Sequence, residues 1–219
     1  MKLILLGPPG AGKGTQCKRI ADRYEIEHLS SGDILRAQRA AGTELGQKAQ
    51  GYMDSGGLVP DDIIISMMID AMKKAAGGYV LDGFPRTVVQ AQELDKALAE
   101  AGEEITGIVN LQVSDDRISG RLTGRRSCPK CGAVYHIQNL KPRAEGICDR
   151  DGEALVQRAD DKPEIVADRL KAYHEQTAVV VGYYQGRGGT VINVDAAGDI
   201  EQVTASIFSK LDLLCSQVG

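Results

Sequence analysis

Residues 7–15 read Gly7-Pro8-Pro9-Gly10-Ala11-Gly12-Lys13-Gly14-Thr15, and this stretch decides how the fold is interpreted. It follows a short aliphatic run, residues 2–6, and leads into a stretch with helical periodicity, residues 16–24. Between a strand and a helix, glycines let backbone N–H groups turn toward phosphate oxygens, and the helix N-terminus adds its dipole. Lys13 supplies a mobile positive charge. We therefore predict a phosphate-binding loop, which departs from the general motif in having Gly14 after the lysine and its hydroxyl at Thr15.

Short apolar runs and helical stretches alternate along most of the chain. The apolar runs cover residues 79–81, 108–113 and 191–194, and helical spacing covers residues 87–101 and 200–214. Strands that alternate with helices form a parallel sheet with right-handed crossovers. The sequence therefore predicts an α/β fold.

Two regions interrupt this alternation. Residues 30–69 are helical in pattern with glycine interruptions, which indicates a small helical insertion. Residues 127–158 are rich in Pro, Gly and Cys and contain a short β-like piece at 133–137. Helix resumes near Pro163, a residue suited to a first helical turn. We expect two inserted subdomains on one core.

Composition excludes several classes of protein. The 219 residues are 42% hydrophobic, enough for a buried core, and 26 Lys and Arg against 30 Asp and Glu give a net charge of -4. A broad basic surface for nucleic acid or anionic membrane is therefore not expected, and 4% aromatics without Trp offer no base-stacking platform. The longest early apolar run, residues 3–6, is too short for a signal peptide. We expect a cytoplasmic protein.

Three of the five cysteines crowd into one short region, which is not a disulfide framework. Cys128 and Cys131 form one two-residue-spaced knuckle, and Cys148 and Asp151 form a second after sixteen intervening residues. Three thiolates and a carboxylate suit tetrahedral Zn²⁺, and four protein ligands leave no open position, so the predicted ion is structural. His136 stays open as a minor alternative ligand.

Three motifs resemble those of adenylate kinases, and the likeness extends over essentially the whole chain. They are residues 7–15, residues 29–36 (LSSGDILR) and residues 81–87 (LDGFPRT). The cysteine-bearing region resembles the lid of the long-lid, zinc-containing bacterial members. The resemblance implies a P-loop fold with a five-stranded parallel sheet, divided into a core (1–29, 60–124 and 164–219), an AMP-binding insertion (30–59) and a lid (125–163).

The resemblance also implies a set of site residues. The implied ATP-binding positions are Gly10, Ala11, Gly12, Lys13, Gly14, Thr15, Arg121, Arg125, Val134, Tyr135 and Gly198. The implied AMP-binding positions are Ser31, Arg36, Gly57, Leu58, Val59, Gly83, Phe84, Pro85, Arg86, Gln90, Arg158 and Arg169. The residues expected around the transferring phosphoryl group are Lys13, Arg86, Arg121, Arg125, Arg158 and Arg169. Ser31 stands where the family usually has Thr, which keeps the hydroxyl.

Arginine side chains are the groups expected to hold two polyanions close together. Phosphoryl transfer spreads charge over oxygens in its transition state, and planar guanidinium groups bind those oxygens bidentately. An acceptor phosphate is already largely dianionic at neutral pH, so no general base and no catalytic His are required. Asp82 follows a strand and is expected to hold Mg²⁺ through water, with Asp33 as a weaker candidate and a plain Asp-Gly turn as the alternative.

The lid region concentrates positive charge. Residues 121–163 hold nine Lys and Arg against six Asp and Glu, a formal +3 in a chain of net -4. This favours an anion clamp over a solvated helix face. Asp160 and Asp161 could help close the lid or cap the Pro163 helix, and we predict capping for one of them.

The leading functional hypothesis is transfer of the terminal phosphoryl group of MgATP to AMP, giving two ADP. We expect Gln90 to recognise the acceptor base, because its amide offers a donor and an acceptor. UMP, CMP or GMP as acceptor, a zinc-ribbon nucleic-acid binder and a plain ATP hydrolase are the alternatives. The first hypothesis implies Mg²⁺ and structural Zn²⁺, and ATP, AMP and ADP as ligands, with no nucleic acid, no membrane and a monomer by default.

Overall fold

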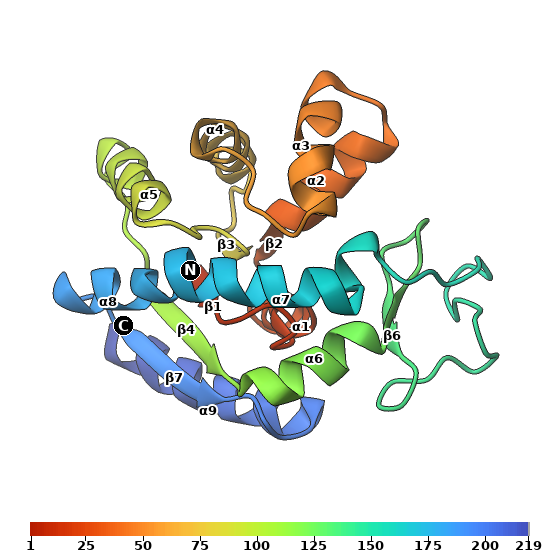
Figure 1. Ribbon diagram of the computed structural model, residues 1–219. Coiled ribbons are helices and arrows are strands. Elements are labelled where there is room, and N and C mark those ends of the chain that lie inside the picture. Colours follow the sequence, from red (N-terminus) through yellow and green to blue (C-terminus); the bar gives the residue numbers. More distant parts are fainter. Residues whose placement is uncertain (219) are drawn as a thin grey trace.

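The computed structural model describes residues 1–218 and has a five-stranded parallel sheet at its centre (Figure 1). The strands lie in the order β2-β3-β1-β4-β7. Their bounds are β1 (Lys2–Leu6), β2 (Glu27–Ser30), β3 (Tyr79–Asp82), β4 (Gly107–Gln112) and β7 (Val191–Asp195). The predicted α/β fold is confirmed. The pattern of apolar runs does not reveal edge strand β2, because its sequence Glu-His-Leu-Ser has a single apolar residue.

Both faces of the sheet are covered by helices. Along β1, Leu3 and Leu5 pack toward one face, and Ile4 and Leu6 pack toward the other. Helices α1 (Lys13–Tyr24) and α9 (Ile200–Val218) cover the first face; α4 (Asp61–Met72), α5 (Val88–Glu100) and α8 (Ala178–Gly186) cover the second. Each fully buried aliphatic side chain contributes about 1.5–3 kcal/mol, so these two layers stabilise the sheet that carries the phosphate loop.

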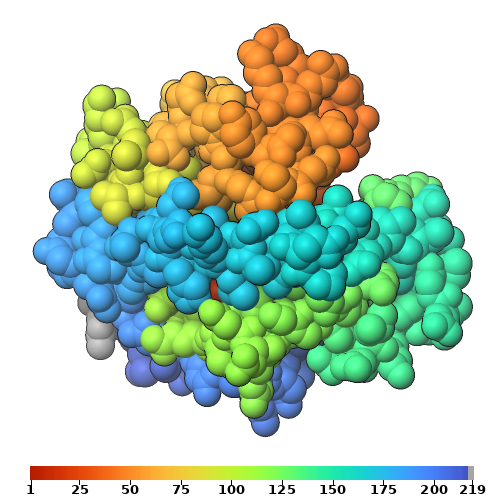
Figure 2. All heavy atoms as spheres, viewed as in Figure 1, coloured from red at the N-terminus to blue at the C-terminus, as the bar shows by residue number. Residues whose placement is uncertain are grey.

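The region predicted to be helical, residues 30–69, is mostly helical from Ser31 onward. It contains α2 (Ser31–Ala40) and α3 (Glu44–Asp54), followed by α4. Ser30 and Thr43 cap the first two helices, because each side chain accepts a hydrogen bond from the backbone N–H three residues on. In Figure 2 these orange segments form a lobe above the band of α7 and α8. The division into core, insertion and lid stays a prediction.

The second interruption contains little regular structure. After α6 (Asp115–Thr123), strands β5 (Arg125–Ser127) and β6 (Val134–His136) pair antiparallel. The chain returns through η1 (Ala159–Asp161) to α7 (Pro163–Ala172), which continues into the π-helical turn η2 (Tyr173–Thr177). Pro163 occupies the first turn as predicted.

The predicted capping by Asp160 or Asp161 is wrong. Lys162 is the N-cap residue of α7, and Asp161 instead pairs with two arginines. The buried carboxylate makes stronger, charge-assisted bonds there than a cap would give. No helix within residues 1–218 combines the length and the apolar character that a membrane crossing requires.

Candidate functional site

The phosphate loop connects β1 to α1 and is shaped by its glycines. Gly10 and Gly12 adopt φ values of +78° and +96°, which L side chains rarely reach. A Cβ at Gly10 would also come within 2.9 Å of the side chain of Leu122 on α6. The Lys13 ammonium group donates to the carbonyl oxygens of Gly7 and Pro8, at 2.7 and 2.8 Å. The loop is therefore a tight backbone turn packed against α6, with its lysine folded over it.

A large cavity of about 1430 Å³ opens above this loop. The loop, the first turn of α1, strands β5 and β6 and the segment before α9 line it. All of the expected ATP-binding residues lie along its wall: Gly10, Ala11, Gly12, Lys13, Gly14, Thr15, Arg121, Arg125, Val134, Tyr135 and Gly198. The structure thus brings together residues from four separate parts of the sequence.

A smaller cavity of about 80 Å³ lies beside it, under the helical insertion. Most of the expected AMP-binding residues line this one: Ser31, Arg36, Gly57, Leu58, Val59, Gly83, Arg86, Gln90 and Arg169. Pro85 and Arg158 line the larger cavity instead. Phe84 lines neither, because its side chain is fully buried in the core next to the sheet. Phe84 can therefore contact a ligand only through its backbone.

Hydrogen bonds inside the smaller cavity hold its polar groups in place. The Ser31 hydroxyl donates to the Gly83 carbonyl at 2.7 Å. The Gln90 amide donates to Asp61 at 2.7 Å and accepts from the Arg86 backbone N–H at 2.7 Å. A primary amide has two N–H groups and two lone pairs, so Gln90 keeps one donor and one acceptor for a ligand.

A buried carboxylate links β5 to α7. The side chain of Asp161 is fully buried and accepts two hydrogen bonds from Arg125, at 2.8 and 2.5 Å, and one from Arg169 at 3.0 Å. Arg169 also lies 2.9 Å from Asp160. The sequence offered no local signal for this arrangement, because the three residues are brought together only by the fold.

The remaining cations of the site are short of negative partners. Burial lowers the pKa of Lys13 to about 8, an effect that nearby Asp82 only partly opposes. Burial and the neighbouring Arg125 lower the pKa of Arg158 to about 9. Burial and Arg169 likewise lower the pKa of Arg86. Such mutual repulsion among buried cations favours the binding of a polyanion, which would relieve it.

Asp82 lies at the carboxyl end of β3, beside the phosphate loop. One of its oxygens would lie 3.3 Å from a Cβ at Gly14, and the same oxygen is 3.2 Å from the Nε2 atom of His28. Burial raises the pKa of Asp82, but His28 and Lys13 outweigh this effect and leave the pKa below its usual value. His28 therefore takes part in orienting this carboxylate. Asp33 pairs instead with Arg36, at 2.6 Å.

Two arginines of α6 hold the segment that precedes α9. Arg121 donates to the carbonyl oxygens of Ala196 and Gly198, at 2.8 and 3.4 Å. Arg117 donates to the carbonyl oxygen of Ala197 at 2.6 Å. Sequence reasoning missed Arg117, which stands in a helix without any motif. Together the two guanidinium groups fix the backbone on the far side of the larger cavity.

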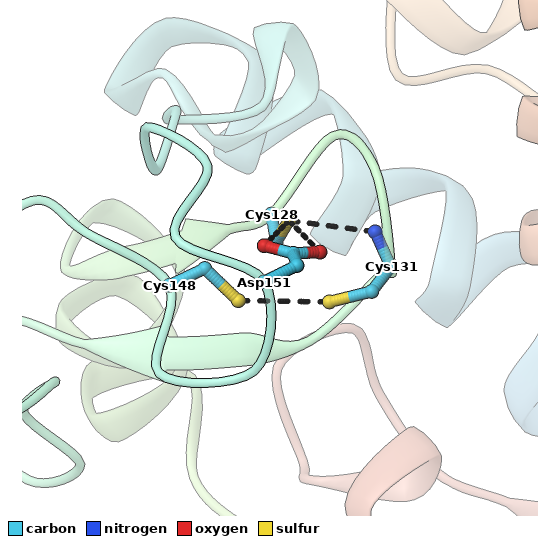
Figure 3. Close-up of side chains that lie close together, drawn as sticks. All are labelled: Cys128, Cys131, Cys148 and Asp151. Atoms are coloured by element: carbon cyan, nitrogen blue, oxygen red, sulfur yellow. Dashed lines mark hydrogen bonds between the residues drawn. The ribbon is translucent and has the colours of Figure 1, made fainter.

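The two knuckles converge in the lid (Figure 3). The ligand atoms of Cys128, Cys131, Cys148 and Asp151 all lie within 4.8 Å of one another. The sulfur atoms of Cys131 and Cys148 are 3.6 Å apart, and that of Cys128 is 3.4 Å from both Asp151 oxygens. A hydrogen bond with the Cys131 thiol helps to hold the pKa of Asp151 well below its usual range.

His136 lies outside this cluster. Its Nδ1 atom accepts hydrogen bonds from the backbone N–H groups of Gln138 and Asn139, and its Nε2 atom is 3.3 Å from the Gly120 carbonyl oxygen. Both ring nitrogens are thus occupied by backbone groups. The minor alternative of a histidine ligand is wrong for this arrangement.

Fold and cavity together define a P-loop nucleotide-binding protein. The chain belongs to the adenylate kinase family, whose profile matches residues 5–189. Proteins named adenylate kinase from Lachnospira eligens and Methanothrix thermoacetophila are 53% and 48% identical to it, each over 213 residues. These alignments cover 96% of this chain in both cases, and 100% and 98% of the relatives. An adenylate kinase from Kosmotoga olearia is 46% identical over 216 residues, covering 98% of this chain and 100% of its own.

Proposed function

We propose that this chain catalyses the reversible transfer of the terminal phosphoryl group of MgATP to AMP, giving two ADP. The observation that carries the proposal is the wall shared by the two cavities. Arg36, Arg86 and Arg169 line both of them. An anion bound on either side of this wall meets the same guanidinium groups, which is what transfer between two bound phosphates requires.

The residues of the chain supply positioning and charge. The loop N–H groups and Lys13 would hold the phosphates of the donor, and the arginines would stabilise charge as it spreads over the transferring oxygens. The acceptor is a phosphate with a second pKa near 6, so it attacks without a protein base. Asp82 would bind waters of the Mg²⁺ that accompanies ATP, and that ion would neutralise phosphate charge.

We propose that the four knuckle residues hold a structural Zn²⁺. With Zn–S bonds of about 2.3 Å, tetrahedral geometry separates two sulfur ligands by roughly 3.8 Å. The 3.6 Å between Cys131 and Cys148 fits this value, and the ionised Asp151 is a suitable fourth ligand. Elemental analysis is expected to find about one zinc per chain, and a metal-free, equally heat-stable protein would contradict the assignment.

The proposal includes the division into a core, an AMP-binding insertion at 30–59 and a lid at 125–163. It also includes a monomer in the cytoplasm. All five cysteines are free thiols, which suits a reducing compartment. Analytical ultracentrifugation with and without nucleotides tests the monomer.

The reaction is tested by measuring MgATP consumption with AMP, UMP, CMP or GMP, and with no acceptor. We expect turnover with AMP far above that with any other acceptor, with two ADP formed for each AMP consumed. Equal turnover with no acceptor would indicate a hydrolase. Failure to turn over any monophosphate, combined with binding to nucleic acid, would favour the zinc-ribbon alternative.

The variant Gln90→Ala tests recognition of the acceptor base. It removes the free donor and acceptor of the amide, so discrimination between AMP and other monophosphates is expected to fall about tenfold. The measurement is the ratio of kcat/KM values for AMP and GMP. Gln47→Ala removes an exposed amide on α3, away from Gln90, and serves as the control. Unchanged selectivity in Gln90→Ala would remove Gln90 from base recognition.

A further inference from the structure

A second group of metal-ligand side chains lies directly beneath the phosphate loop. Cys17 on α1, His28 on β2 and Asp82 on β3 each place a ligand atom within 4.8 Å of the other two. Cys17 is fully buried, and the side chains of His28 and Asp82 are 13% and 12% exposed. None of the motifs that point to nucleotide binding includes Cys17 or His28.

The sheet register explains why the three side chains meet. His28 on β2 lies opposite Val80 on β3, and side chains two residues apart on a strand point to the same face. His28, Val80 and Asp82 therefore project to one face of the sheet. Helix α1 packs on that face, and its residue Cys17 lies against the same side chains. All three ligands stand on regular elements, so their separation is fixed by the fold.

The donor set differs from the one that Mg²⁺ prefers. Mg²⁺ takes oxygen ligands and keeps several waters, whereas a thiolate, an imidazole and a carboxylate together suit Zn²⁺ and similar borderline-soft divalent ions. Asp82 also lines the larger cavity, which gives an ion a path from solvent to this group.

We propose that Cys17, His28 and Asp82 form an inhibitory site for a thiophilic divalent cation such as Zn²⁺, distinct from the knuckle cluster in the lid. Binding would displace the Cys17 thiol proton to solvent and form a metal–sulfur bond, with no change of oxidation state. It would also withdraw the Asp82 carboxylate from magnesium-bound water and add net positive charge beside Lys13. The binding stands independently of the proposed function; only the inhibition rests on it.

Co²⁺ added to the purified full-length protein tests the binding, because a thiolate bound to Co²⁺ gives a charge-transfer absorption band. We expect the wild-type spectrum to contain a thiolate–cobalt component that is missing in Cys17→Ala. Cys215→Ala removes the other cysteine outside the lid and is the matched control, expected to match wild type. A Cys17→Ala spectrum and affinity identical to wild type would overturn the proposal.

The second readout is inhibition by Zn²⁺ at saturating MgATP and AMP. We expect Cys17→Ala to retain normal activity without added Zn²⁺ and to require about tenfold or more Zn²⁺ for half-inhibition. His28→Gln, which can still donate to Asp82, is expected to show the same resistance. Equal inhibition of wild type and both variants would place the inhibitory ion elsewhere. If wild type shows no phosphotransfer even without added Zn²⁺, the proposed function is contradicted, and the Co²⁺ result can still be interpreted.

Discussion

Lys13 and Asp161 carry opposite charges and are held in different ways. Lys13 folds its ammonium group over the phosphate loop onto two carbonyl oxygens, in surroundings that disfavour its charge. Asp161 is fully buried but satisfied by two guanidinium groups. A ligand with several negative charges would therefore strengthen the hold on Lys13 and compete with Asp161 for its arginines. Each of these residues gives a separate prediction.

ATP affinity is expected to fall as the pH rises above about 8. The pKa of Lys13 is lowered to about 8, and a bound phosphate is expected to raise it. The attraction between the Lys13 ammonium group and the ATP phosphates is thus fully present below the pKa of Lys13 in the free protein. Above that pKa the ATP affinity falls by at most about tenfold per pH unit, until the pKa of Lys13 in the complex is passed. Calorimetry in two buffers should detect proton uptake on ATP binding near pH 9.

Lys13→Met is the control for this pH dependence. Without the titrating ammonium group, binding should be weak at every pH. It should take up fewer protons in this range than wild type, with Arg158, whose pKa is lowered to about 9, left to titrate. A wild-type affinity that stays constant from about pH 7 to about pH 10 would show that Lys13 does not contact the nucleotide.

Asp161→Asn is expected to lower the free energy of unfolding by about 3 kcal/mol, because it leaves two guanidinium groups without their buried counter-charge. Asp160→Asn is the matched control, since Asp160 is partly exposed and forms its ion pair with Arg169. It should cost about 1 kcal/mol or less. Urea titrations of both variants provide the measurement, and equal losses would contradict a special role for the buried carboxylate.

At the scale of elements, the proposed lid (residues 125–163) is the part of the chain least able to stay folded by its own apolar contacts. Its own apolar cluster consists of two knuckle cysteines with Ala133 and Tyr135, against which Leu155 packs. So few buried side chains cannot offset the entropy of ordering the segment. A metal ion that joins the two knuckles would supply the missing free energy.

Metal removal should therefore unfold the lid before the core. A strong chelator, or Cys128→Ser, is expected to make residues 125–163 sensitive to protease while the sheet and its helices stay intact. Limited proteolysis followed by mass spectrometry locates the cleavage. Cys215→Ser, outside the lid, should leave the digestion pattern unchanged. A lid that resists protease equally with and without metal would show that its fold does not depend on the ion.

At the scale of the whole molecule, the helical insertion approaches α7 closely. Gly56, with φ at +76°, lies where a Cβ would come within 2.8 Å of Ile165 and 2.9 Å of Arg169. The same glycine lines both cavities. Its lack of a side chain lets the insertion and the long helix that crosses the molecule in Figure 1 meet around the shared arginine wall.

Gly56→Ala is expected to raise the KM for AMP about tenfold, because its methyl group would hold the insertion away from α7. Gly42→Ala is a matched control: Gly42 also has a positive φ, +67°, but nothing lies within 4 Å of its added Cβ. Both substitutions carry a backbone cost of about 1–2 kcal/mol, and only the first should change the KM. Similar kinetics for the two variants would mean that the close approach is not needed for AMP binding.

The sequence predicts the elements that rest on local patterns and misses those that depend on distant contacts. The phosphate loop and the knuckles are each defined by spacing within a few residues, so their geometry could be anticipated. Strand β2 reads Glu-His-Leu-Ser, which contains no apolar run, and it is stabilised by β3 alongside it. Asp161 and His28 acquire their partners only when separate parts of the chain meet. The nucleotide roles of individual residues came from resemblance and stay predictions.

The arginine wall common to both cavities makes donor and acceptor thermodynamically inseparable. Whatever factor the first nucleotide imposes on the affinity of the second, the second imposes on the first, whichever enters first. The product of the two dissociation constants must therefore be the same whether the donor or the acceptor binds first. For this chain, an affinity quoted for one nucleotide has meaning only together with the concentration of the other.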